Sequence, residues 1–307
     1  MVSMEHRNRG KKLNQCIEAD ADGMNLEQYL RQRMNFTRAE IRAMKFRENG
    51  LLLNGERVRV SKILGAGDVL EVRLEDEAAC SEQLEATAEP IKILYEDDDL
   101  LAVWKEAGLV VHPAHGHYKD TLSNRVHAYF QGKGEQVRIR SIGRLDKDTS
   151  GIVVFAKNQI SAARLWKQKE EGVFRKEYLA VCEGEFSAME GEICTPIAPM
   201  PGEKMKMCVS PEGAFALTRY RVLRRENGRS LLAVQIETGR THQIRVHMAS
   251  VGHAVVGDVL YGTENRTSGE GLQLYAWKAN LWQPFSGNGL EISCPEVREF
   301  LQNGKAL

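Results

Sequence analysis

Segment 141–158, S-I-G-R-L-D-K-D-T-S-G-I-V-V-F-A-K-N, places two carboxylates among basic and hydroxyl side chains directly before an apolar stretch. The β-branched residues within 152–156 are typical of a buried strand. Reactive side chains are commonly carried by a loop that such a strand holds in place. Asp146 or Asp148 could therefore serve as a nucleophile or a general base.

Two other interpretations of this loop stay open. It could be a solvated turn in which an aspartate accepts a hydrogen bond from a nearby backbone amide. It could also be a phosphatase-like Asp-x-Asp motif, whose first aspartate is a nucleophile. That motif needs an apolar strand directly before its first aspartate, whereas residues 138–144 contribute three arginines. We favour the phosphatase-like interpretation least.

As a whole, segment 143–151 resembles the signature Arg-Leu-Asp-x-x-Thr-Ser-Gly of the RluA-type family of RNA pseudouridine synthases. One position departs, because Gly143 stands where the family usually has His. The resemblance implies that Asp146 is the catalytic carboxylate and that Arg144 contacts the substrate.

Segment 238–247, T-G-R-T-H-Q-I-R-V-H, resembles another motif of the same family. It follows an expected strand at 231–237, and Thr241 is expected to cap a helix that begins after it. Apolar spacing leaves Arg245 near one edge of the helix's apolar stripe, so without the resemblance it would be a surface arginine. The resemblance implies that Arg245 pairs with the catalytic carboxylate, and we assign Arg240 and His242 to substrate binding.

Two further residues are assigned to the pocket. Tyr178 follows basic residues on an expected strand, where composition alone predicts an ordinary half-buried tyrosine. The Lys-x-Tyr pattern resembles that of the family, which implies that Tyr178 lies against the target base. Segment 272–276 resembles the family's Leu-His-Ala strand, with Tyr275 in place of His, which implies that Leu274 closes the active site.

The loop at 112–117 contains three histidines, which could be imagined as zinc ligands. It lacks a carboxylate or thiolate at suitable spacing and contains Pro and Gly. Segment 105–113 also resembles the stretch that precedes the family's catalytic motif. We therefore expect a plain loop and no metal site.

Residues 13–74 are expected to form a small α/β module. Capping patterns at Asn25 and Thr37 predict two helices. Asn54-Gly55 between the apolar segment 51–53 and the alternating segment 57–60 predicts a β-hairpin, and a last strand is expected at 69–74. This order resembles the S4 RNA-binding domain.

Charge supports an RNA-binding surface on this module. Between Arg31 and Lys62 there are nine basic residues and three acidic ones, although such a charge run is often only a solvated face. We assign RNA binding to six of these nine basic residues, namely Arg31, Arg38, Arg42, Lys45, Arg57 and Arg59.

The chain divides by composition into a basic tail at 1–12, the S4-like module at 13–74, an acidic linker at 75–90 and a catalytic domain at 91–303. Many short strands and few helices predict an α+β catalytic domain with a mainly antiparallel mixed sheet flanked by helices. Strands are expected at 91–94, 100–104, 152–156, 178–182, 218–223 and 231–237. Helices are expected at 122–130, 161–169 and 243–251.

The 307 residues carry 42 basic and 42 acidic side chains and no long apolar stretch, so we expect no membrane span. The six cysteines are scattered, which indicates reduced thiols and a cytoplasmic protein. Because isomerisation of uridine adds and removes no atom, we expect no cofactor. We expect a monomer that acts on RNA, with large-subunit ribosomal RNA favoured over transfer RNA. Two alternatives stay open, a catalytically inactive S4-type RNA-binding factor and a metal-dependent hydrolase using Asp146, Asp148 and the histidine loop.

Overall fold

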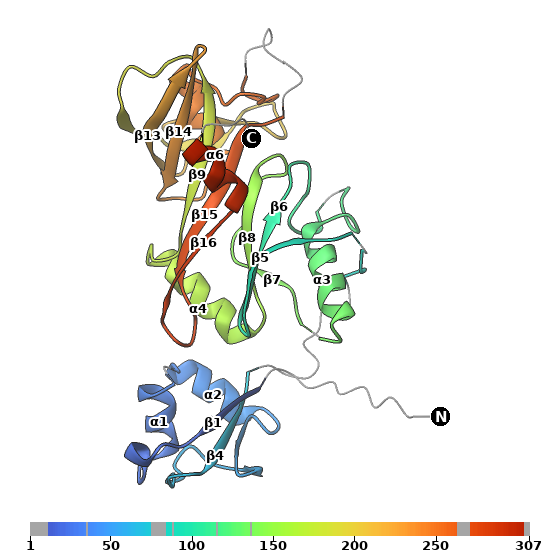
Figure 1. Ribbon diagram of the computed structural model, residues 1–307, viewed down its shortest axis with the longest axis vertical. Coiled ribbons are helices and arrows are strands. Elements are labelled where there is room, and N and C mark those ends of the chain that lie inside the picture. The colour runs from blue at the N-terminus through green and yellow to red at the C-terminus, as the bar shows by residue number, and fades with distance from the viewer. Residues whose placement is uncertain are drawn as a thin grey trace.

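The computed structural model describes residues 12–34, 36–74, 84–87, 89–114, 116–135, 137–262 and 271–303. Within these ranges the chain forms a small amino-terminal module and a larger domain (Figure 1). Most of the predicted basic tail and much of the predicted acidic linker lie outside the described residues. Lys12, placed in the tail by composition, begins the first strand.

The amino-terminal module, residues 12–74, combines a four-stranded sheet with two helices. Its elements are β1 (Lys12–Cys16), a 3₁₀ turn (Ala19–Ala21), α1 (Leu26–Gln32), α2 (Arg38–Phe46), β2 (Leu51–Leu53), β3 (Glu56–Arg57) and β4 (Val69–Arg73). The strands are ordered β1-β4-β2-β3.

Local signals in the module are confirmed. The Asn25 side chain accepts a hydrogen bond from the amide of Gln28, and Thr37 and Glu40 form a reciprocal capping box. Asn54 and Gly55 both have positive φ, which the two-residue turn requires. The hairpin's second strand is shorter than expected, and β1 was not predicted. The alternation in Lys12–Cys16 is weak because only Leu13 of its first four residues is apolar.

The larger domain contains the predicted strands and helices, mostly extended by one to three residues. They are β5 (Lys92–Glu96), β6 (Leu100–Lys105), α3 (Leu122–Gly132), β8 (Ser150–Ala156), α4 (Gln159–Glu170), β9 (Arg175–Glu183), β13 (Leu217–Glu226), β14 (Arg229–Ile236) and α5 (Gln243–Ser250). The remaining elements are β7 (Arg140–Ser141), β10 (Glu190–Cys194), β11 (Ile197–Pro199), β12 (Met207–Val209), β15 (Leu274–Trp282), β16 (Gly289–Ser293) and α6 (Pro295–Asn303).

The central sheet is ordered β10-β13-β14-β9-β15-β8-β6-β5, with β16 beside β15 and β7 beside β8. All pairings are antiparallel except that between β15 and β8. One face packs against α3 and α5, and the other packs against α4 and α6. The predicted α+β fold with a mainly antiparallel mixed sheet is confirmed.

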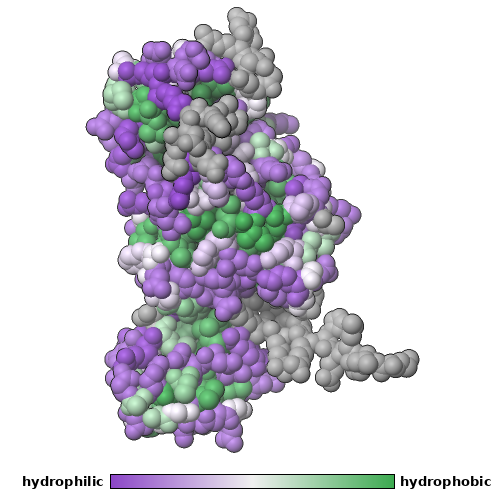
Figure 2. Space-filling view, viewed as in Figure 1, coloured by the Kyte–Doolittle hydropathy of each residue, from purple (hydrophilic) through white to green (hydrophobic). Residues whose placement is uncertain are grey.

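The face seen in Figure 2 is mostly hydrophilic, with a band of hydrophobic residues across the larger domain. Among the described helices, none combines the length and the apolar composition that crossing a bilayer requires.

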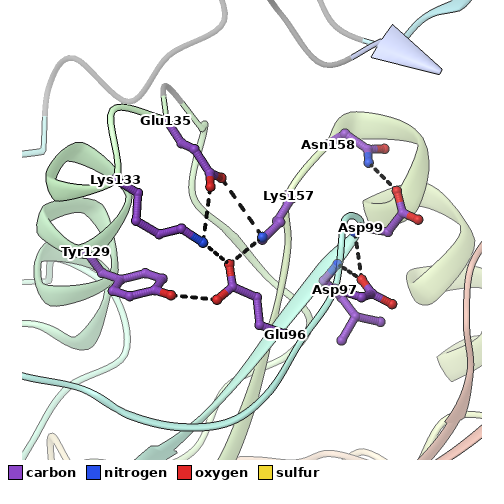
Figure 3. A network of polar contacts seen from close by, with 9 residues as sticks. Glu96, Asp97, Asp99, Tyr129, Lys133, Glu135, Lys157 and Asn158 are labelled. Atoms are coloured by element: carbon purple, nitrogen blue, oxygen red, sulfur yellow. Dashed lines mark hydrogen bonds and ion pairs between the residues drawn. The ribbon is translucent and has the colours of Figure 1, made fainter. Parts of the chain in front are cut away.

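A polar network ties α3 to the sheet (Figure 3). Glu96 accepts hydrogen bonds from Tyr129, Lys133 and Lys157. Burial alone would raise the pKa of Glu96, but these three donors lower it to about 2. The ionised carboxylate therefore stabilises the fold.

We predict that Glu96→Gln lowers the free energy of unfolding at pH 7. Since the folded-state pKa lies near 2 and the ordinary value is 4.5, the stabilisation is complete above pH 4.5 and is lost as the pH falls toward 2. Denaturant unfolding at several pH values should show the difference between variant and wild type shrinking over that range. The exposed Glu185→Gln is the control, and a difference independent of pH would contradict the prediction.

Candidate active site

Three neighbouring strands bring the sequence motifs together. Residues 142–149, called the catalytic loop after the role predicted for Asp146, lead into β8, which pairs in parallel with β15 at Tyr275 and Ala276. The next strand is β9, where Tyr178 lies opposite Ala276. Asp146, Tyr178 and Leu274 therefore lie close together over the middle strands of the sheet, and α5 follows the end of β14 beside them.

These residues line a cavity of about 210 Å³. All seven residues predicted for catalysis or substrate binding are part of its wall, namely Arg144, Asp146, Tyr178, Arg240, His242, Arg245 and Leu274. Lys169, Lys176 and Thr149 also line it. The six basic residues predicted for RNA contact are exposed on the module and are not part of this wall.

The hydrogen-bond partner of Arg245 differs from the prediction. Its Nε and Nη2 atoms donate to the two carboxylate oxygens of Asp258, both at 2.7 Å, whereas Asp146 acts on it through the field of its charge. Arg245 is buried rather than at the edge of a surface helix, and the Asp258 side chain is fully buried. Burial opposes the charge of Arg245, but Asp258 raises the pKa of the guanidinium.

Thr241 is not the cap of α5. The cap position is taken by His242, whose φ of 56° is left-handed and whose side chain makes no capping bond. The Thr241 hydroxyl instead accepts a hydrogen bond from Arg144 Nη2 at 2.7 Å. This bond joins the catalytic loop directly to the segment before α5.

Tyr261 connects several parts of the cavity wall. Its hydroxyl accepts a hydrogen bond from the amide of Met207 and lies 2.9 Å from His242 Nδ1. Its ring lies 5.2 Å from the guanidinium carbon of Arg245. Burial lowers the pKa of His242, which the charge of Asp146 partly offsets, so the imidazole is neutral at pH 7.

The protonation of two residues on β9 is shifted. Burial, together with the charge of Asp146, raises the pKa of Tyr178, so its hydroxyl stays protonated at neutral pH. Burial and the charge of Lys169 lower the pKa of Lys176 to about 7. Lys176 Nζ donates to the carbonyl of Ile152 at 2.7 Å, which holds it against β8.

The buried side chain of Lys105 binds the backbone of the catalytic loop. Lys105 Nζ donates to the carbonyls of Glu106, Leu109 and Lys147 at 2.7 to 2.9 Å. Burial lowers the pKa of Lys105 to about 8, although the negative charges of Asp148 and Asp146 partly oppose this shift. Because Lys147 directly follows Asp146, this contact fixes the backbone beside the candidate catalytic carboxylate.

Geometry requires the glycine at 151 and favours the one at 143. Gly151 has φ of 142°, and a Cβ there would lie 2.6 Å from atoms of Ala276, so only glycine permits this approach of β8 to β15. Gly143 has φ of 83°, and a Cβ would lie 2.7 Å from Lys169 Nζ. The glycine that replaces the family's usual His therefore leaves room for a lysine beside the cavity.

Leu274 and Tyr275 face opposite sides of β15, as consecutive strand residues do. Leu274 is 3% exposed and faces the cavity. Tyr275 packs in the cluster on the other face, and its hydroxyl donates to Gln273. The change from His to Tyr at 275 therefore lies outside the cavity wall.

The described histidines at 112–117 have protein partners. His112 lies between the hydroxyls of Ser123 and Ser141, at 2.8 and 2.5 Å. His117 Nδ1 is 2.6 Å from an oxygen of Asp120, and His115 lies outside the described residues. His112 thus joins this loop to the start of the catalytic segment.

Sequence reasoning missed Asp258, Tyr261 and Lys105. The pattern Gly-Asp-Val-Leu-Tyr-Gly at 257–262 carried a signal, since an aspartate in a glycine-bounded turn often uses its side chain for local hydrogen bonds. Asp258 Oδ1 does accept from the amides of Leu260 and Tyr261. Lys105 stands in an apolar strand, where a charged residue needs buried acceptors.

Comparisons with known proteins agree with this arrangement. Residues 99–250 match the family described as RNA pseudouridylate synthase. An uncharacterized RNA pseudouridine synthase of Bacillus subtilis is 36% identical over 219 residues, covering 71% of this chain and 77% of that protein. Ribosomal large subunit pseudouridine synthase D of Haemophilus ducreyi is 33% identical, covering 95% of this chain and 93% of that protein.

Solved structures give the same result for the fold. Human RNA pseudouridylate synthase domain containing 1 superposes with a TM-score of 0.57 at 26% identity, covering 68% of this chain and 85% of its own. Human RNA pseudouridylate synthase domain containing 4 has a TM-score of 0.55 at 24% identity, covering 66% and 87%. The predicted resemblance to RNA pseudouridine synthases is confirmed, and the chain belongs to this family of isomerases that act on RNA.

Proposed function

We propose that this enzyme converts uridine to pseudouridine in large-subunit ribosomal RNA, with Asp146 as the catalytic carboxylate. The observation that carries the proposal is the cavity in which Asp146, Tyr178 and Arg245 meet. The target RNA is inferred from relatives that bear the name ribosomal large subunit pseudouridine synthase D. The alignment with one of them covers 95% of this chain, so it extends into the amino-terminal module.

The reaction defines what the cavity must do. The bond between uracil N1 and ribose C1′ breaks, the base turns, and a bond from C5 to C1′ forms. The C5 proton is lost and N1 gains a proton, so the product is an isomer of the substrate. A carboxylate at the sugar fits either route to this exchange, by attacking C1′ or by removing a sugar proton.

Six further residues of the wall are given roles in this scheme. The Tyr178 ring and Leu274 bound the space for the uracil, which must leave its stack to enter. Arg245, held by Asp258, presents a fixed positive charge to Asp146. Arg144, Arg240 and His242 line the cavity and are proposed to contact the sugar and phosphates.

The amino-terminal module is proposed to bind the surrounding RNA as an S4-like domain. Arg38, Arg42 and Lys45 are exposed at spacings of four and three residues on α2, so they share one face of the helix. Arg57 is exposed beside the end of α2, where it donates to the carbonyls of Lys45 and Arg47. This grouping suits a phosphate backbone.

We also propose that the protein acts in the cytoplasm as a monomer. The residues proposed for catalysis line a single cavity within the larger domain. The described cysteines, Cys16, Cys182, Cys194, Cys208 and Cys294, are free thiols, which is usual for a reducing compartment.

We predict that Asp146→Asn abolishes pseudouridine formation while RNA affinity changes less than about twofold. The amide keeps the size of the side chain but cannot act as nucleophile or base, so turnover should fall at least about a hundredfold. Single-turnover product formation and filter binding on the same RNA measure the two quantities. Turnover near that of the wild type would contradict the role of Asp146.

We predict that Arg245→Lys lowers turnover at least about tenfold although the positive charge is kept. Lysine cannot donate to both oxygens of Asp258 as the guanidinium does, so the charge moves relative to Asp146. Asp258→Asn should destabilise the fold by about 3 to 5 kcal/mol because it leaves a buried cation without its counter-charge. Denaturant unfolding and single-turnover rates test these effects, and a fully active Arg245→Lys would contradict the geometry.

We predict that the triple variant Arg38→Gln, Arg42→Gln, Lys45→Gln weakens binding to long RNA. The slope of log affinity against log salt should become shallower by about two to three, since each lost phosphate contact removes 0.7 to 0.9. Titrations at several salt concentrations measure the slope, with the exposed Lys167→Gln as control. An unchanged slope would show that this face does not contact phosphates.

A further inference from the structure

The contact between the module and the larger domain centres on Arg164 of α4. Its guanidinium carbon lies 5.0 Å from the ring centre of Phe36 in the module and 4.5 Å from that of Phe285 in the larger domain. The two rings also meet edge to face, with centres 6.0 Å apart. Only 13% of the Arg164 side chain is exposed, so the cation–π contacts are partly desolvated and correspondingly stronger.

Hydrogen bonds from the same guanidinium reach both parts of the chain. Arg164 donates to the carbonyl of Pro284 in the larger domain at 2.9 Å and to that of Met34 in the module at 3.4 Å. Its Nε atom lies 3.5 Å from Glu40. Because Glu40 also closes the capping box of α2, the helix with the proposed RNA-binding face is fixed to α4.

Apolar packing surrounds this contact. Ile160, in the first turn of α4, is 4% exposed and belongs to the hydrophobic core of the module. Arg47 of the module donates to the side chain of the neighbouring Gln159 at 3.0 Å. Ile160, at the start of α4, is therefore packed in the module's core, whereas Ala162 and Leu165 of the same helix pack in a core cluster of the larger domain.

The other end of α4 reaches the active site. Lys169 lines the cavity and lies about 14 Å along the helix axis from Ile160, at about 1.5 Å per residue. Gln168 exchanges two hydrogen bonds with the backbone of Trp282, at 2.8 and 2.9 Å. This fixes α4 to β15, the strand that carries Leu274.

We propose that Arg164 is a specificity-determining residue, because it fixes the module on α4 and so sets the distance and direction from the basic face of α2 to the cavity. This inference rests on the proposed RNA binding by the module. An enzyme with that fixed geometry acts on a uridine at a set position relative to the RNA segment that the module holds. Free movement of the module would let other uridines reach the cavity.

The first test measures the geometry without reference to activity. Cys16 in the module and Cys194 in the larger domain are exposed, so spin labels can be attached there after Cys80→Ser and Cys208→Ser. The parent and the control Lys167→Ala, on the same helix, should give one narrow distance distribution. Arg164→Ala should broaden it, and an unchanged distribution would overturn the proposal.

The second test measures selectivity with the full chain. On a short stem-loop containing the target uridine, Arg164→Ala should keep its turnover within about twofold. On full-length ribosomal RNA, the ratio of target to off-target modification should fall at least about tenfold. A broadened distance distribution with unchanged selectivity would overturn the role in specificity.

The α2 triple variant separates this inference from the function on which it rests. If that variant binds long RNA as tightly as the parent, docking by the module is wrong and the specificity role fails with it. If it binds weakly and Arg164→Ala still selects its target normally, docking stands and only the role of Arg164 is wrong.

Discussion

The buried ion pair between Arg245 and Asp258 is the interaction on which the candidate active site depends. Both side chains are almost completely removed from water. The free-energy cost of burying each charge is offset only because the opposite charge lies beside it. The pair fixes α5 against the turn at 257–262, and Tyr261 of that turn reaches His242 and the hairpin of β11 and β12. The positive charge of Arg245 is thereby fixed beside the catalytic loop. A fixed charge of this kind can stabilise the charge that develops in a transition state.

The catalytic loop is also bound by a second buried cation, Lys105. The Lys105 ammonium donates three hydrogen bonds to backbone carbonyls, including that of Lys147. The hydrogen bond from Arg144 to Thr241 connects this loop to the segment before α5. The residues on either side of Leu145 and Asp146 are thus bound to other parts of the domain, Lys147 by Lys105 and Arg144 by Thr241.

Much of this architecture could be predicted from sequence because its signals are local. The capping boxes, the Asn-Gly turn and the apolar strands specify their own conformation within a few residues. β1 and β10 were missed since their alternating patterns are weak and their pairing partners, β4 and β13, lie far along the chain. The seven cavity residues were found through motif resemblance, whereas the partner of Arg245 was not. Helical spacing shows which face a residue occupies, but not which loop brings a carboxylate to it.

A map of pseudouridine at single-nucleotide resolution is the most direct test of the central claim. Unmodified ribosomal and transfer RNA would be incubated with the wild-type protein and with Asp146→Asn, without added metal or nucleotide. New pseudouridine at defined positions of large-subunit ribosomal RNA, absent with the variant, is the result predicted here. Modification that persists in the variant would contradict the catalytic role of Asp146, and modification confined to transfer RNA would contradict the proposed target.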